Sequence, residues 1–140
     1  MAPDRKKEDR KASPAEDHPC VEMSEGVARY LMAIGDLSRS GERPTQARLA
    51  RELDVSQPSA LEMVRKLRGM GLVREDGVEL TAEGTSAALV LTSRRNAARD
   101  LTREVLGLEP EEAGLEAEQL ASTASPALGR KLVAWRASRS

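Results

Sequence analysis

Two neighbouring segments in the middle of the chain carry apolar residues at helical spacing. The first has Ala47, Leu49, Ala50 and Leu53, and the second has Ala60, Leu61, Val64 and Leu67. Each set lines one side of a helix, so the two helices can pack with their apolar faces together. Only Asp54-Val55-Ser56 separates them, a length typical of a helix-turn-helix. We expect Val55 to fill the angle between the helices.

Polar residues next to these segments signal where each helix begins. Thr45 is expected to cap the first helix, and Ser56 or Gln57 the second. Both positions carry side-chain acceptors for the free N–H groups of a first helical turn. Pro58 takes a first-turn position, where no N–H is needed.

A hairpin is predicted after the second helix, which should end near Gly69 or Gly71. Leu72-Val73-Arg74 and Val78-Glu79-Leu80 are expected to form two short strands around a Glu75-Asp76-Gly77 turn. The order of helix, turn, helix and hairpin from Thr45 to Leu80 predicts a winged helix-turn-helix. Such a unit places its second helix in the major groove of duplex DNA.

Further helices are predicted on both sides of this unit. They run from near Glu22 to Ser38, from Thr81 to Val105, from Pro110 to a break at residues 122–125, and from Pro126 to the end of the chain. The expected fold is mainly α. It comprises a disordered tail over residues 1–20, a winged helix-turn-helix DNA-binding domain over 21–83, and an α-helical dimerisation domain over 84–140. The last helices offer more apolar surface than the DNA-reading unit needs, so we expect a homodimer.

Composition narrows the class of partner. Tyr30 and Trp135 are the only aromatic residues, too few for the stacking platforms of single-strand and RNA binders. One cysteine and one histidine exclude a disulfide framework and a multi-cysteine metal site. No Gly-rich phosphate loop or nucleophile–base pair is present, so we do not expect an enzyme. No apolar run is long enough for a membrane span, and we expect a cytoplasmic protein with duplex DNA as its partner.

The net charge of −1 is low for a DNA-binding protein, but the charges are unevenly placed. Arg65, Lys66 and Arg68 lie on or beside the second helix. Five acidic residues without an intervening base form a separate block: Glu109, Glu111, Glu112, Glu116 and Glu118. A locally basic footprint is therefore compatible with a neutral chain. The alternative is a winged-helix adaptor that binds protein and does not read DNA.

The second helix should present its N-terminal residues to the DNA. Its outward face carries Ser59, Glu62, Met63 and Lys66, and Ser56 and Gln57 precede it. Hydrogen-bonding side chains at this end of a recognition helix read base edges, and the free N–H groups attract phosphate.

The complete series of motifs resembles the diphtheria-toxin-repressor and manganese-transport-regulator family of metal-dependent repressors. The motifs are Tyr30-Leu31 with Ile34, Ala47-Arg48-Leu49-Ala50 with Leu53, Ser56-x-Pro58-Ser59, Gly71-Leu72-Val73, Leu80-Thr81-x-x-Gly84 and Gly107-Leu108-Glu109. The resemblance implies a dimer on a palindromic operator. It also implies base-edge roles for Ser56, Gln57, Pro58, Ser59 and Glu62, and phosphate contacts for Gln46, Arg48 and Lys66.

The resemblance also implies a Mn²⁺ or Fe²⁺ site, but the residues at its ligand positions have changed. These positions hold Arg29, Met32, Arg95, Arg99, Glu118, Ala121 and Ser122. Of these, only Glu118 could be a ligand in its expected place, since arginine neither coordinates a metal nor loses its charge. We therefore predict no cofactor.

Two interpretations of the replacements remain open. Arg95 and Arg99 could form a salt bridge with Glu118 that replaces the metal, or charged residues could simply have accumulated at an unused surface. An alternative function is a repressor that still responds to Mn²⁺ or Fe²⁺ through a rebuilt site at His18, Cys20 and Glu22.

Overall fold

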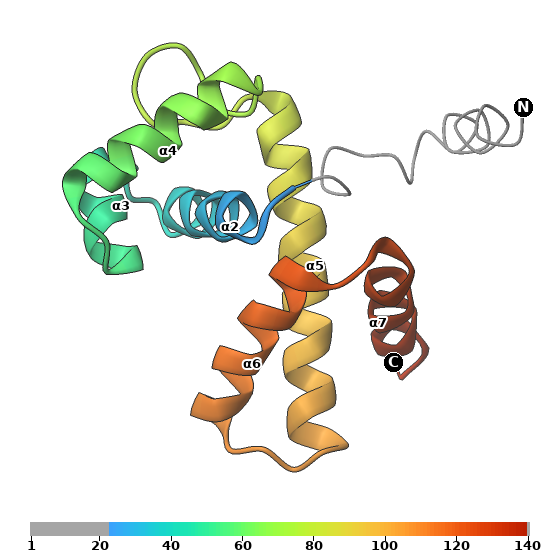
Figure 1. Ribbon diagram of the computed structural model, residues 1–140. Coiled ribbons are helices and arrows are strands. Elements are labelled where there is room, and N and C mark those ends of the chain that lie inside the picture. Colours follow the sequence, from blue (N-terminus) through green and yellow to red (C-terminus); the bar gives the residue numbers. More distant parts are fainter. Residues whose placement is uncertain (1–22, 140) are drawn as a thin grey trace, which may run out of the picture.

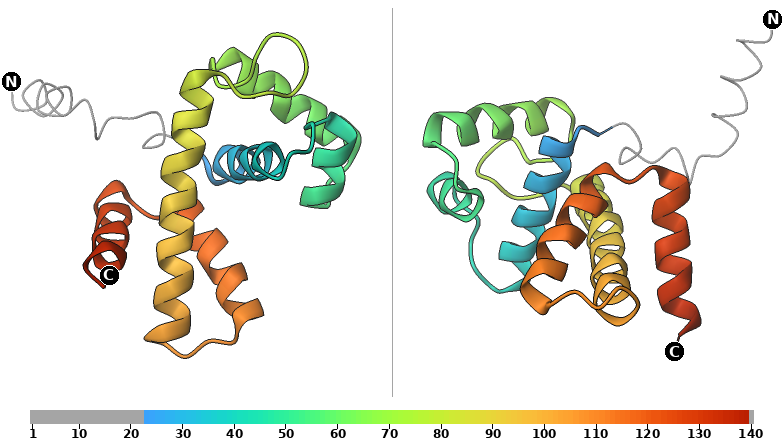
Figure 2. Two further views of the ribbon diagram at one scale, coloured as in Figure 1. Left: turned by 180° about the vertical axis from the view of Figure 1, so that it is seen from behind. Right: turned by 60° about the horizontal axis from the view of Figure 1, so that its bottom comes forward.

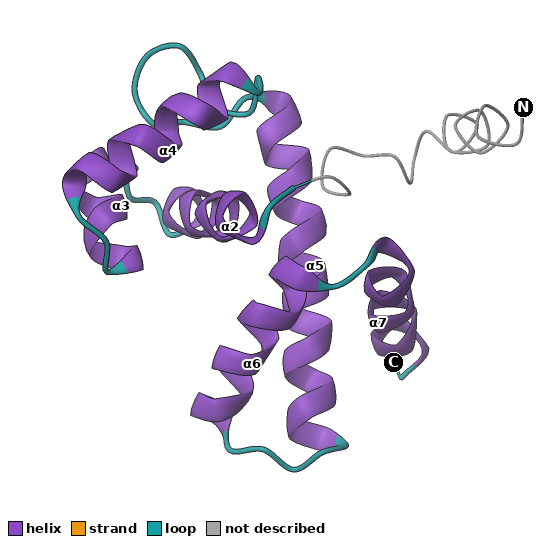
Figure 3. Cartoon of the chain, viewed as in Figure 1, coloured by secondary structure: helices purple, strands orange, loops and turns teal. Residues whose placement is uncertain are grey.

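The computed structural model describes residues 23–139 and contains six helices over that range (Figures 1 and 3). They are α2 (Glu25–Arg39), α3 (Gln46–Leu53), α4 (Gln57–Gly69), α5 (Ala82–Glu104), α6 (Pro110–Thr123) and α7 (Pro126–Ser138). The expected mainly α fold is confirmed. The predicted tail over residues 1–20 lies outside the described residues, and so does Glu22, where the first helix was expected to begin.

Side-chain caps explain where most of the helices begin. The hydroxyl oxygens of Ser24, Thr45, Ser56, Thr81 and Ser125 each accept a backbone N–H from the first turn of the following helix. These contacts satisfy donors that have no partner inside the helix. The predicted caps at Thr45, Ser56 and Thr81 are confirmed.

The long helix α5 connects the two halves of the structure (Figures 1 and 2). Its first half packs against α2, which lies among α3, α4 and α5, and its second half lies between α6 and α7. The larger apolar cluster is centred on α2 and reaches Leu91 of α5 and Ala121 of α6. A smaller cluster of Ala97, Ala98, Ala117 and Leu132 joins α5, α6 and α7. The division predicted at residue 83 stays a prediction.

The predicted wing hairpin is mostly a loop. In place of two strands, the segment between α4 and α5 has a single antiparallel bridge between Val73 and Leu80, with the N–H of Arg74 donating to the carbonyl of Glu79 at 2.8 Å. The chain reverses at Gly77, where φ is +73°, a conformation that favours glycine. Two three-residue strands are too short to extend this ladder without a third strand beside them.

None of the helices between residues 23 and 139 is both long enough and apolar enough to cross a lipid bilayer.

Candidate nucleic-acid interface

The turn between α3 and α4 holds the two helices at a fixed angle. Asp54 ends α3 in the left-handed conformation, with φ of 55° and ψ of 51°. The N–H of Val55 then donates to the carbonyl of Ala50 at 2.9 Å. Val55 itself is 36% exposed, so the prediction that it fills the interhelical angle is wrong. The backbone hydrogen bonds and the left-handed residue, not an apolar side chain, define this turn.

Polar groups gather at the N-terminus of α4, as predicted. The Ser56 hydroxyl oxygen accepts the N–H of Ser59 at 3.2 Å and also donates to the Ser59 hydroxyl at 3.0 Å. Gln57, Pro58, Ser59 and Glu62 are exposed. Met63 was expected on this outward face, but it packs against the main apolar cluster. The exposed surface of α4 is therefore narrower and more polar than the sequence indicated.

The three residues predicted to contact phosphate differ in the contacts that their side chains make within the protein. The side-chain amide of Gln46 donates to the carbonyl of Gln57 at 3.4 Å, which ties the start of α3 to the start of α4. Arg48 contacts two carboxylates, Glu42 at 3.2 Å and Glu52 at 3.6 Å. Lys66 is exposed on α4. Lys66 is the more available cation, because a phosphate would have to compete with two acids for Arg48.

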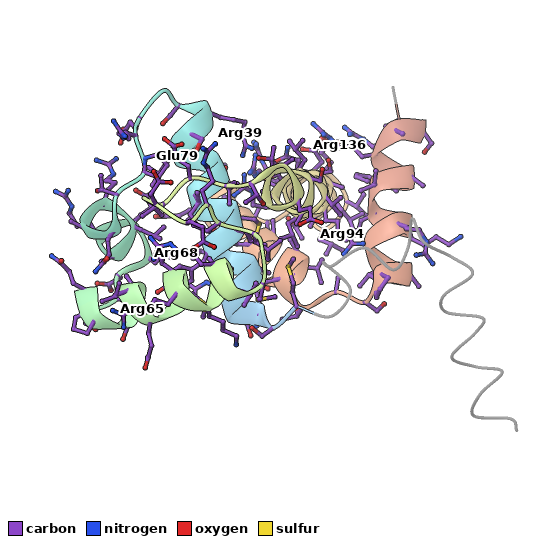
Figure 4. All side chains as sticks on the ribbon, turned by 90° about the horizontal axis from the view of Figure 1, so that it is seen from above. Arg39, Arg65, Arg68, Glu79, Arg94 and Arg136 are labelled. Atoms are coloured by element: carbon purple, nitrogen blue, oxygen red, sulfur yellow. The ribbon has the colours of Figure 1, made fainter. Side chains whose placement is uncertain are left out.

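Arg68, near the C-terminal end of α4, reaches toward the wing. Its Nε donates to the carbonyl of Arg74 at 3.0 Å, and its Nη2 donates to the carbonyl of Gly77 at 2.6 Å. In the view from above, Arg68 lies on the wing side of α4, and Arg65 lies on the outer side (Figure 4). Arg68 was interpreted from the sequence as part of the basic footprint. The structure shows that its guanidinium binds the protein's own backbone.

The residues at the family's metal-ligand positions do not fit a divalent metal. Met32 is 1% exposed within the core, and Ala121 is also buried there. The Ser122 hydroxyl donates to the carbonyl of Glu118 at 2.6 Å. Between residues 23 and 139 no group of three or more His, Cys, Asp or Glu side chains could hold a metal ion. The alternative ligands His18, Cys20 and Glu22 lie outside the described residues.

Arg95 is paired with Asp36 rather than with Glu118. Its Nη1 lies 2.8 Å from Asp36 Oδ2 and its Nη2 lies 3.0 Å from Asp36 Oδ1, a bidentate contact that joins α5 to α2. Arg39 also contacts Asp36, at 2.5 Å. The predicted bridge from Arg95 and Arg99 to Glu118 is therefore corrected, since no ion pair in the described range joins these residues. Asp36 faces Arg95 with both oxygens, whereas Glu118 acts on Arg95 only through its charge.

Hydrogen bonds and charges around this pair shift both pKa values toward the ionised forms, against the effect of burial. Partial burial acts to raise the pKa of Asp36, but the hydrogen bonds and charges of Arg95 and Arg39 outweigh it, and the pKa lies below its ordinary value. The hydrogen bond to Asp36 raises the pKa of Arg95 against the opposing effect of burial, and the charges of Asp36 and Glu118 add to the rise. The Arg95 side chain is only 12% exposed, so the pair remains charged in a sheltered contact.

Sequence reasoning missed Asp36 altogether, and it assigned Arg68 to the basic footprint without finding its contact with the wing. A signal existed for Asp36, because it is a carboxylate inside a helix whose neighbouring residues are mostly apolar and buried. Such a residue usually has a charged partner. No comparable signal existed for Arg68, since a basic residue at a helix C-terminus is common whether or not it has a tertiary role.

Comparisons with known proteins agree with this geometry. Residues 22–77 match the family described as "Iron dependent repressor, N-terminal DNA binding domain". The chain is 33% identical over 115 residues to the iron-dependent repressor IdeR of Mycobacterium tuberculosis H37Rv, covering 80% of this chain and 50% of that protein. It is 37% identical over 92 residues to the transcriptional regulator MntR of Escherichia coli O157:H7, covering 64% and 59%.

A solved manganese-dependent transcriptional repressor in complex with manganese superposes with a TM-score of 0.71 at 31% identity, covering 77% of this chain and 51% of that one. The helix-turn-helix, wing and following helices thus define a winged helix-turn-helix fold of the DNA-binding class. Residues 22–77 therefore carry the N-terminal DNA-binding domain of the iron-dependent repressor family, a family of transcriptional repressors and not of enzymes. The resemblance found in the sequence is confirmed. The chain spans about half the length of these curated IdeR relatives.

Proposed function

We propose that this protein is a homodimeric transcriptional repressor that binds a palindromic operator in cytoplasmic DNA without needing a bound metal. The observation that carries the proposal is the Asp36–Arg95 contact, which joins α2 in the DNA-reading half to α5. The names of the relatives, by contrast, state a dependence on iron or manganese. A bidentate guanidinium–carboxylate pair fixes both distance and orientation. It can therefore hold α2 against α5 in one arrangement with no ion present.

The loss of metal ligands supports the same proposal from a different direction. Arg29, Arg95 and Arg99 place positive charges at positions where a metal site needs donors that have lost their protons. The excess of positive charge would repel a divalent cation, and among the family's ligand positions Glu118 alone carries a carboxylate.

Exposed apolar residues at the far end of α5 and α6 support the proposed dimer. Val105, Leu106 and Leu115 are 60%, 64% and 69% exposed. Leu106 and Leu115 also line a groove of about 710 Å³ together with Leu108 and Leu120. Large exposed apolar surfaces on a small protein usually mark an interface. A second copy placed here would bring two reading heads to one operator, which raises both affinity and specificity.

Selection of bound duplexes from a random pool, carried out with the purified chain in excess chelator, tests the proposal. We expect enriched sequences with two half-sites related by a dyad, about one helical turn apart. Electrophoretic shifts on a selected duplex should give the same affinity in chelator and after addition of Mn²⁺ or Fe²⁺. Binding that is absent in chelator and restored by either metal would disprove metal independence, and selection of no sequence at all would disprove operator recognition.

The roles of individual α4 residues can be separated by their different dependence on sequence and salt. Ser59→Ala and Glu62→Gln should change the preference at particular base pairs by about 1–3 kcal/mol each, because their side chains lie at the groove-entering end of the helix. Lys66→Ala should weaken binding to all sequences and lower the slope of log affinity against log salt by about 1. Unchanged DNA binding in all three variants would show that α4 is not the recognition helix.

A further inference from the structure

The wing has little secondary structure of its own. One backbone bridge joins Val73 to Leu80, and its two hydrogen bonds run from the N–H of Arg74 to the carbonyl of Glu79 and from the N–H of Thr81 to the carbonyl of Leu72. Of the residues between Arg74 and Glu79, only Val78 is buried. An isolated pair of strands this short is marginally stable in water. The loop therefore needs a contact from elsewhere in the protein to keep one position.

Arg68 makes such a contact. Its two donating nitrogens bind two carbonyls of the loop, that of Arg74 before the turn and that of Gly77 within the turn. The guanidinium is a rigid planar fork, and hydrogen bonds from a charged donor are stronger than those between neutral groups. Figure 4 shows Arg68 on the side of α4 that faces the wing. One side chain thus ties the first arm and the turn of the wing to α4.

The charge of the wing makes its position important. Residues 72–80 contain one basic residue, Arg74, and three acidic residues, Glu75, Asp76 and Glu79. A wing with this composition is repelled by phosphates unless it presents Arg74 to the DNA and turns its carboxylates away. A wing free to move would lose that arrangement and would oppose binding.

We propose that Arg68 is a positioning residue that holds the wing against α4 in its DNA-binding position and does not itself bind phosphate. The inference rests on the DNA-binding function proposed above, but the contact it describes exists without DNA. It assigns to Arg68 a role distinct from that of Arg65, which lies one turn earlier and on the outer side of the same helix.

Hydrogen exchange of the wing amides in the full, DNA-free protein tests the first half of this proposal. In Arg68→Ala the amides of Arg74 and Thr81, which donate in the wing bridge, should exchange about tenfold faster or more, which corresponds to the loss of hydrogen bonds from a charged donor. Arg68→Lys should also speed exchange, because one ammonium does not reproduce the fork that reaches both carbonyls. Arg65→Ala is the matched control and should leave exchange in the wing unchanged. Unchanged exchange in Arg68→Ala would overturn the proposal.

Affinity for a selected duplex tests the second half. Arg68→Ala should bind about tenfold more weakly, and Arg68→Lys should not restore the affinity even though it restores the charge. Full affinity in Arg68→Lys would show that Arg68 acts as a simple cation at the phosphates and would overturn the positioning role. If the unaltered protein does not bind DNA either, the proposed function fails, but the hydrogen-exchange result still decides whether Arg68 holds the wing.

Discussion

Gly84→Ala should markedly destabilise the protein, even though alanine is the better helix former. Gly84 lies in the first turn of α5, where a Cβ atom would fall well inside van der Waals contact of the Leu72 carbonyl oxygen and 3.2 Å from Cδ2 of Leu80. That carbonyl accepts the N–H of Thr81 at 3.0 Å, so it cannot move away freely. Overpacking of this kind costs about 1–3 kcal/mol, and contact with backbone places Gly84 at the upper end.

Urea unfolding followed by circular dichroism measures this effect. Gly114→Ala is the matched control, because Gly114 lies within α6 and an added Cβ there meets nothing within 4 Å. That variant should be more stable than the unaltered protein by about 0.5–1 kcal/mol, as expected from helix propensity alone. If Gly84→Ala is also stabilised, the close approach of α5 to Leu72 is not present in solution.

Asp36→Asn should destabilise the contact between α2 and α5 and weaken operator binding in chelator. The substitution keeps the shape of the side chain but removes the charge that faces the Arg95 guanidinium. We expect a loss of about 1–2 kcal/mol in the free energy of unfolding, because Arg95 is sheltered while Asp36 is 44% exposed. Asp76→Asn in the exposed wing is the control and should lie within about 0.5 kcal/mol of the unaltered protein.

The effect of Asp36→Asn should depend on pH in a defined direction. The folded-state pKa of Asp36 is depressed, so the carboxylate contributes stability above its unfolded pKa of about 3.9 and loses that contribution as pH falls through the folded value. The difference in stability between the two proteins should therefore be complete at pH 7 and shrink below about pH 4. A difference that stays constant down to pH 3 would show that Asp36 is not ionised and paired.

A double-mutant cycle separates the ion pair from other effects of each substitution. Asp36→Asn and Arg95→Gln should be strongly non-additive, with the double variant more stable than the sum of the single changes predicts by about 1 kcal/mol. Additive losses would mean that the two side chains stabilise the fold independently. In that case the contact could not be the element that replaces a metal.

The helix-turn-helix was predictable because its signals are local. The spacing of Leu49, Ala50, Ala60 and Val64, together with the caps at Thr45 and Ser56, depends only on residues a few positions apart. The wing was predicted at the correct place but as two strands. Turn residues such as Asp76-Gly77 indicate where the chain reverses. The number of backbone hydrogen bonds between the two arms depends instead on the tertiary contacts that the segment makes.

The candidate site divides in the same way. Ser56, Gln57, Pro58, Ser59 and Glu62 are exposed around the start of α4, as their sequence positions predicted. Met63 is not, because its side chain packs against the main apolar cluster beside the start of α2. Whether a residue at the edge of a helix face is exposed or packed inward depends on the neighbouring helix, which comes from a distant part of the sequence.

The sequence by itself therefore determined the helices, their caps, the turn between α3 and α4, and the loss of the family's metal ligands. These follow from side-chain chemistry and from hydrogen bonds within one or two turns. Only the tertiary structure decided that Arg95 pairs with Asp36 and that Arg68 holds the wing. Arg95 lies 59 positions from Asp36, and its choice between Asp36 and Glu118 depends on how α2, α5 and α6 pack. An ion pair forms with the carboxylate that the packing brings within hydrogen-bonding distance.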